Sequence, residues 1–150
     1  MKTYVITLSK TFPKTHKRAG EPTNFRTLFE TGVKKHTIRA NYPLWKKRME
    51  EVQEGKACLS IRQWSGKPYA SKQEEICRLS ADNGVGIQYM YYPELMCGTL
   101  DKDGKDITKK LSASQLANND GLSFIDWQDW FKDYDLSQPL AIIHFTKFRY

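Results

Sequence analysis

The sequence lacks long hydrophobic runs. Its longest apolar stretches, such as Pro139–Ile143, span only a few residues and are too short to form a transmembrane helix. The residues after Met1 alternate between polar and apolar types, without the continuous apolar segment of a secretory signal peptide. We therefore expect a cytoplasmic protein that has no membrane partner.

The sequence also lacks the spacings that are typical of metal and cofactor sites. It has three cysteines but no Cys-x-x-Cys pair, and its three histidines do not form His-x-His or His-Glu-x-x-His. Gly84-Val85-Gly86 lacks the third glycine and the following helix of a dinucleotide-binding loop. These absences predict reduced, mostly buried thiols, no metal site and no cofactor.

The charge of the chain is concentrated in its first third. The chain has 150 residues and a net charge of +7, and residues 1–50 contain 12 Lys and Arg against 3 acidic residues. A clustered positive charge favours an anionic partner such as nucleic acid or a phosphorylated ligand, although a basic surface that only aids solubility has the same composition. We expect one domain over residues 1–150, acting as a monomer, with a basic loop or arm at about residues 10–22.

Short strand patterns outnumber helix patterns along the chain. Because strands and helices do not alternate regularly, a doubly wound sheet is disfavoured. The sequence instead predicts an α+β protein, a small mixed β-barrel with peripheral short helices. In this barrel Ala57–Trp64 and Leu140–Phe148 would share one curved sheet, with helix Pro43–Glu54 outside it. The other expected elements are helices Phe25–Glu30, Leu111–Ala117 and Phe124–Phe131, strands Thr3–Ser9, Lys35–Ala40, Ile76–Ser80 and Val85–Tyr91, and a hairpin around Asp103-Gly104.

The segment from Gly32 to Arg39 contains the main candidate site. On a strand, Thr37 and Arg39 point to the same face, and strict alternation would add Lys35. A bend after Gly32 would bring Lys34 to that face instead. A hydroxyl, an amine and a guanidinium together can activate a nucleophile and hold an anion. The alternative is an ordinary strand edge, where lysines discourage aggregation.

This segment resembles a known family. Gly32, Lys34, Thr37 and Arg39 match the G-x-K-x-x-T-x-R signature of ASCH domains, which are relatives of the PUA RNA-binding fold. The resemblance extends from about Phe25 onward, and near the end of the chain it is a similarity of pattern only. It implies a PUA-like β-barrel that binds RNA or nucleotides. Some small members of the family are amidohydrolases that remove the acetyl group of N4-acetylcytidine.

The resemblance also implies roles for individual residues. In those enzymes a Lys and a Thr of the motif act with a Glu, and their positions correspond here to Lys34, Thr37 and Asp120. The acid is therefore one methylene shorter than in the family. One hypothesis is a basic cleft that binds RNA or a nucleoside- or nucleotide-type ligand, with Lys35 and Arg39 among its contacts. The alternative is an amidohydrolase at the same site, and a protein-interaction module has no motif to support it.

A second candidate contact lies in the segment from Trp64 to Tyr69. Trp64, Lys67 and Tyr69 surround a glycine turn. Aromatic faces stack on bases and ammonium groups contact phosphates, which predicts ligand binding by these three residues. The alternative is that Trp64 packs into the core while Tyr69 covers a hairpin.

Overall fold

The computed structural model describes residues 1–92, 96–100 and 106–150, and the hairpin turn expected at Asp103-Gly104 lies outside these ranges. Eight strands and four α-helices are present in the described ranges, with one 3-10 turn. In chain order they are β1 (Lys2–Thr7), α1 (Phe25–Glu30), β2 (His36–Arg39), α2 (Tyr42–Gln53), β3 (Ala57–Trp64), β4 (Gln73–Leu79), η1 (Ala81–Asn83), β5 (Gly86–Tyr91), β6 (Met96–Leu100), β7 (Asp106–Lys110), α3 (Ala113–Asn119), α4 (Phe124–Phe131) and β8 (Leu140–His144).

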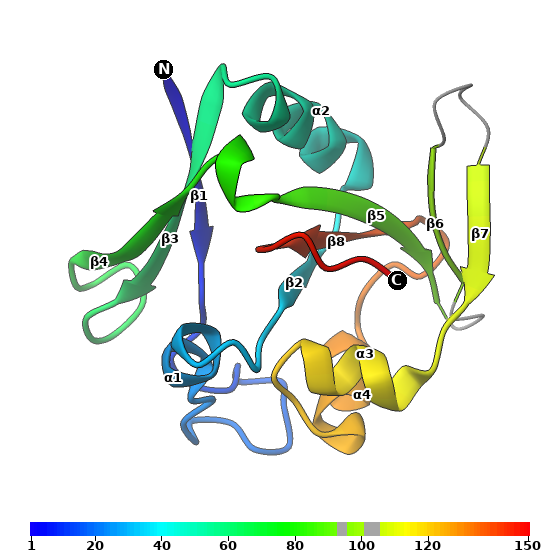
Figure 1. Cartoon of the computed structure of the whole chain (residues 1–150). Helices are drawn as coiled ribbons and strands as arrows, with labels where there is room; N and C mark the ends of the chain where they lie inside the picture. The colour runs from blue at the N-terminus through cyan, green and yellow to red at the C-terminus, as the bar shows by residue number, and fades with distance from the viewer. Residues whose placement is uncertain (93–95, 101–105) are drawn as a thin grey trace.

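The strands form two separate sheets (Figure 1). The smaller sheet has the order β1-β3-β4, in which β1 runs parallel to β3 and β4 runs antiparallel to it. The larger sheet has the order β2-β8-β5-β6-β7, and its neighbouring strands are all antiparallel. The molecule is therefore a mixed α+β protein with two open sheets.

The expected β-barrel is wrong. Among the described residues the two sheets share no strand, and β3 and β8 belong to different sheets rather than to one curved sheet. At the lower end of β1, the Arg39 side chain donates from Nη2 to the backbone carbonyl of Thr7 at 2.7 Å. This side-chain contact links β2 of the larger sheet to the end of β1 in the smaller sheet, and among the described residues no strand pairing joins the two sheets.

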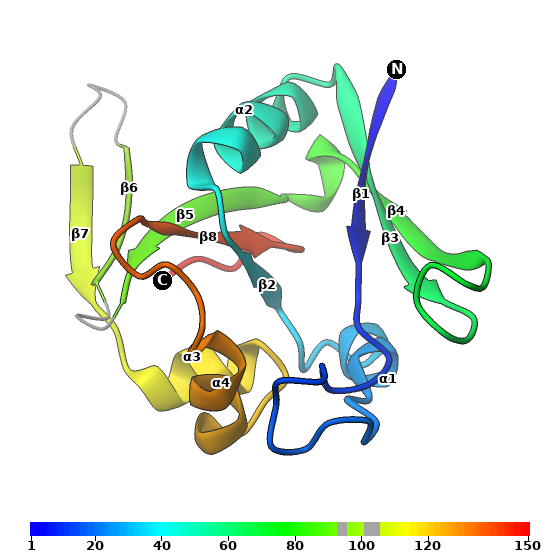
Figure 2. The same cartoon turned by 180° about the vertical axis from the view of Figure 1, so that it is seen from behind.

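Helix α2 spans the two sheets at one end of the molecule (Figure 2). Its buried face consists of Trp45, Met49 and Val52, and the helix contacts β3, β5 and β8. Burying side chains of this size stabilises the fold by roughly 1.5–3 kcal/mol each. The Asn41 side chain accepts a hydrogen bond from the backbone N–H of Leu44 and so caps the start of the helix.

The other three helices gather at the end opposite α2, in both views (Figures 1 and 2). The backbone of Lys35 joins them to the large sheet, because its N–H donates to Asn119 at the end of α3 and its carbonyl accepts from Phe145 after β8. This arrangement brings the start of β2 beside the end of α3. Within the described residues, no helix has the length and apolar character needed to cross a membrane.

Candidate functional site

A cavity of about 380 Å³ lies between the start of β2, the end of α4 and the loop after β1. Its volume falls within the range of small-molecule sites, roughly 300–1,000 Å³. Aromatic rings of Phe25, Trp130, Phe131 and Tyr134 form much of its wall. Its polar lining includes Lys34, Thr37, Arg39, Asp120 and Asp133. Four residues that the sequence analysis singled out therefore share one cavity: Lys34, Thr37, Arg39 and Asp120.

Lys34 and Asp120 form a buried ion pair in the cavity wall. Lys34 Nζ lies 2.9 Å from Asp120 Oδ1 and 2.6 Å from the backbone carbonyl oxygen of the same residue. The ammonium also lies 4.2 Å from the centre of the Phe25 ring. Burial lowers the pKa of Lys34, and the Asp120 carboxylate opposes this by raising it. Asp120 thus reaches the lysine, although its side chain is one methylene shorter than the glutamate of the ASCH amidohydrolases.

Two glycines allow Lys34 to enter the cavity. Gly32 has φ of 80° after α1, and the N–H of Lys34 then returns to the carbonyl of Leu28 at 2.9 Å. A Cβ on Gly121 would lie 3.4 Å from the Lys34 Cβ and Cδ atoms. The structure therefore contains the bend that was one of the two sequence alternatives. Lys35 does not line this cavity, and its Nζ lies 4.7 Å from the centre of the Phe148 ring.

Thr37 and Arg39 point into the cavity from β2. Arg39 Nε lies 3.3 Å from Thr37 Oγ1, and Arg39 Nη2 is held by the Thr7 carbonyl. Burial lowers the pKa of Arg39, but a guanidinium remains charged near neutral pH. The hydroxyl of Thr37 therefore lies beside a fixed cation, in a cavity that the buried ion pair also lines.

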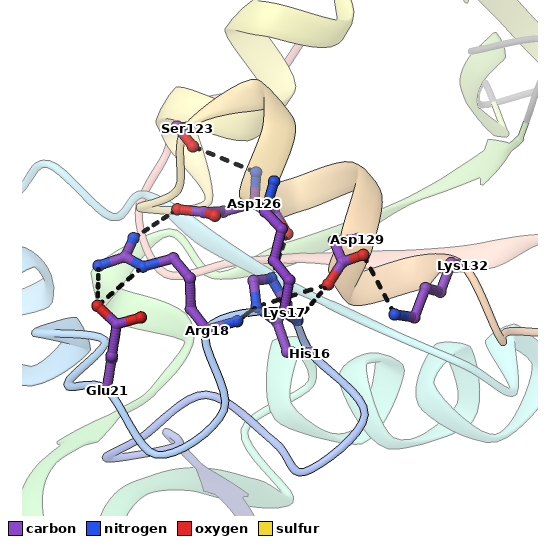
Figure 3. A network of polar contacts seen from close by, with 8 residues as sticks. All are labelled: His16, Lys17, Arg18, Glu21, Ser123, Asp126, Asp129 and Lys132. Atoms are coloured by element: carbon purple, nitrogen blue, oxygen red, sulfur yellow. Dashed lines mark hydrogen bonds and ion pairs between the residues drawn. The ribbon is translucent and has the colours of Figure 1, made fainter.

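The expected basic loop or arm at residues 10–22 is folded against α4, and we call these residues the strap (Figure 3). His16 Nε2 lies 2.9 Å from the backbone carbonyl oxygen of Asp126, and Lys17 N–H donates to Asp129 Oδ2 at 2.8 Å. Arg18 Nη1 lies 2.6 Å from Asp126 Oδ2. Two further strap residues, Pro13 and Thr15, line the cavity. The strap is thus one wall of the site.

Trp64, Lys67 and Tyr69 lie in the hairpin between β3 and β4, and none of them lines the cavity. The rings of Trp64 and Tyr69 are 5.2 Å apart at their centres. Tyr69 is 91% exposed and has φ of 64°, which is uncommon for a residue other than glycine. Lys10 Nζ donates to the carbonyl of Ser65 at 3.0 Å and connects the strap to this hairpin.

The positive charge of the first fifty residues is partly neutralised. Several of its basic side chains pair with acids that are distant in the sequence, which weakens the positive field that the charge count suggests. Those that pair with a distant acid are Lys2, Arg18, Arg26 and Lys34.

Sequence reasoning missed several contributors to the site. Trp130 and Tyr134 line the cavity, but their helical spacing is equally typical of core packing. His36 and Tyr150 lie directly behind Asp120, and no local motif marks them. Within the described ranges, no group of three or more His, Cys, Asp or Glu side chains is placed to hold a metal ion.

Comparisons with protein-family models, with curated proteins and with solved structures found no match to this chain. The function is therefore argued from the geometry of the site.

Proposed function

We propose that the cavity binds a nucleoside- or nucleotide-type ligand. The observation that carries this proposal is the combination of aromatic walls with a hydroxyl, two cations and two carboxylates inside one cavity. Stacking of a base on an aromatic ring contributes about 1–3 kcal/mol. The ASCH resemblance of Gly32, Lys34, Thr37 and Arg39 supports the same class of ligand.

The carboxylates favour a base that has an exocyclic amine. Asp120 and Asp133 are both part of the lining, and a carboxylate accepts from the N4 amine of cytosine. Arg39 supplies a fixed donor for a carbonyl or phosphate oxygen of the ligand. Cytidine is therefore the first probe, and uridine, which has a carbonyl in place of the amine, is its control.

Calorimetric titration of cytidine into the wild-type protein and Thr37→Val tests the proposal. Valine has nearly the shape of threonine but lacks the hydroxyl, and a lost hydrogen bond of about 0.5–1.5 kcal/mol weakens binding roughly twofold to tenfold. Thr31→Val is the matched control, because the exposed Thr31 hydroxyl bonds within its own turn at the end of α1. Equal affinities for cytidine and uridine, or for wild type and Thr37→Val, would contradict this ligand orientation.

A second candidate function is an amidohydrolase at the same residues. It is favoured by a lysine whose pKa burial lowers, beside a threonine hydroxyl that lines the same cavity. In the fraction of molecules in which Lys34 has released its proton to solvent, Thr37 Oγ1 would attack the acetyl carbon of N4-acetylcytidine and Lys34 would take the hydroxyl proton. The C–N bond then breaks, the released amine receives that proton, and water hydrolyses the threonine ester to acetate. Arg39 would stabilise the oxyanion.

Conversion of N4-acetylcytidine to cytidine and acetate, followed by chromatography, tests this second candidate. Thr37→Val removes the nucleophile and should abolish turnover, whereas Thr37→Ser retains a hydroxyl and should keep part of it. Turnover that survives in Thr37→Val would exclude Thr37 as the nucleophile. Absence of turnover in the wild type, together with cytidine binding, would leave the binding function alone.

A further inference from the structure

Two fully buried histidines lie behind the cavity. The rings of His36 and His144 are 5.5 Å apart at their centres, and both residues are 0% exposed. Burial lowers the pKa of His36, and it lowers the pKa of His144 to about 2. Each ring is therefore neutral near pH 7 and has a single N–H. Its partners determine which ring nitrogen carries that proton.

The partners of His36 place its proton on Nδ1. Its Nε2 lies 2.5 Å from the Tyr150 hydroxyl, and that hydroxyl already accepts from Asn119 Nδ2 at 3.0 Å. The hydroxyl proton is therefore available to donate to Nε2. On the other side of the ring, Nδ1 lies 3.6 Å from Asp120 Oδ1. A lone pair there would repel the carboxylate, whereas an N–H attracts it.

The partners of His144 place its proton on the other nitrogen. Its Nε2 lies 2.9 Å from Gln88 Oε1, which also accepts from the backbone N–H of Tyr150 at 3.0 Å. Because a backbone N–H can only donate, this contact fixes the amide so that its oxygen faces both donors. His144 therefore donates from Nε2. The two neighbouring histidines have opposite tautomers.

We propose that His36 is a positioning residue for the cavity, with its Nδ1–H directed at Asp120 and its ring held from the other side by the Tyr150 hydroxyl. The series Tyr150, His36, Asp120 and Lys34 then connects the C-terminal segment to the wall of the site. A neutral ring orients the carboxylate toward Lys34 without adding a second positive charge beside the ammonium. The positioning role of His36 rests on the proposed ligand site, whereas the assignment of the two tautomers does not.

Long-range ¹H–¹⁵N correlation spectra of the histidine rings at pH 7 test the tautomers directly. We expect Nδ1–H for His36 and Nε2–H for His144. His16 should also show Nε2–H, because its Nδ1 accepts from the backbone N–H of Arg18 at 2.9 Å. An Nε2–H signal for His36 in the wild type would overturn the proposal.

Tyr150→Phe is the variant that tests the relay, since it removes one hydroxyl and keeps the ring. His36 Nε2 loses its donor, so we expect the ¹⁵N signal of Nε2 to shift downfield toward that of an imidazole nitrogen without a hydrogen bond, while Asp120 keeps the proton on Nδ1. His144 is the internal control, because Gln88 bonds only to the backbone of Tyr150 and should hold its tautomer. If the ¹⁵N shift of His36 Nε2 is the same in Tyr150→Phe as in the wild type, the Tyr150 hydroxyl does not donate to it, and the series from Tyr150 to Lys34 is overturned.

Cytidine titration of Tyr150→Phe tests the positioning role of His36 separately from the proposed function. We expect about a threefold to tenfold weaker affinity, because Asp120 is less well oriented. If the Nε2 signal of His36 shifts but the affinity does not change, His36 is not a positioning residue. If the wild type does not bind cytidine while the predicted tautomers are observed, the proposed ligand is wrong and the proton arrangement stands.

Discussion

Replacing Asp120 by asparagine would leave the Lys34 ammonium buried without its counter-charge, and the loss of stability has an upper bound. Lys34 is only 3% exposed. At pH 7 the lysine can release its proton instead of remaining charged. Deprotonating a group whose ordinary pKa is ~10.4 costs about 1.36 kcal/mol for each pH unit below that value, which is about 4.6 kcal/mol at pH 7. This agrees with the roughly 3–5 kcal/mol observed when one partner of a buried pair is removed.

The pH dependence identifies the charge on Lys34 as the cause. In Asp120→Asn the folded-state pKa of Lys34 lies further below its unfolded value, because burial lowers it and the carboxylate no longer raises it. The unfolded chain then binds one more proton than the folded chain between these two pKa values. The free energy of unfolding should therefore rise with pH by up to about 1.4 kcal/mol per unit between pH 7 and 10. The wild type should rise less steeply, because Asp120 holds the proton on Lys34.

Urea unfolding at pH 7, 8 and 9 measures both effects. We would compare the wild type, Asp120→Asn and the double variant Lys34→Met/Asp120→Asn, in which no ammonium is left. The double variant should recover part of the stability at pH 7 and lose the extra pH dependence. Identical slopes for the wild type and Asp120→Asn, or a loss below about 1 kcal/mol at pH 7, would refute the claim that Asp120 keeps Lys34 charged.

Two further predictions concern the strap and the hairpin. Burial opposes ionisation of Asp126, but hydrogen bonds from Arg18 and Ser123 hold its pKa below the usual value. Its contribution to stability is therefore present above pH ~4 and lost as the pH falls further, so Asp126→Asn should weaken the dependence of the urea midpoint on pH between pH 5 and 2. If the hairpin contacts RNA, Tyr69→Ala should weaken binding of a labelled oligouridylate by about 1–3 kcal/mol in fluorescence anisotropy, while Tyr69→Phe retains it. Equal binding by the wild type, Tyr69→Ala and Tyr69→Phe would show that Tyr69 does not contact RNA.

Local patterns predicted the elements that depend on local interactions. The bounds expected for α1, β3 and α4 match the structure. The final strand was predicted too long, because β8 ends at His144 and the following residues turn back over Gly84 and Gly86. A Cβ at either glycine would collide with the side chains of Lys147 or Arg149. No periodicity in residues 140–148 indicates this return.

The arrangement of the two sheets and half of the site depend on contacts between residues that are distant in the sequence. Lys34, Thr37 and Arg39 lie within six residues, so one short motif predicted them together. His36 and Tyr150 are 114 residues apart, and their contact follows only once β2 and β8 have paired. Sheet closure is equally non-local. It depends on which strands pair across the molecule, and hydrophobic alternation along one strand contains no information about its partner.

The pairing of β2 with β8 also has a consequence for the time course of folding. His36 pairs with His144, so β2 leaves the ribosome about 5–20 s before its partner at ordinary rates of synthesis. During that interval a short strand with an apolar Ile38 has no partner and is open to pairing with other chains. Lys34, Lys35 and Arg39 flank it, and charges next to an unpaired strand suppress aggregation. Two of these cations, Lys34 and Arg39, border the cavity in the folded protein and would thus also protect the unfinished chain.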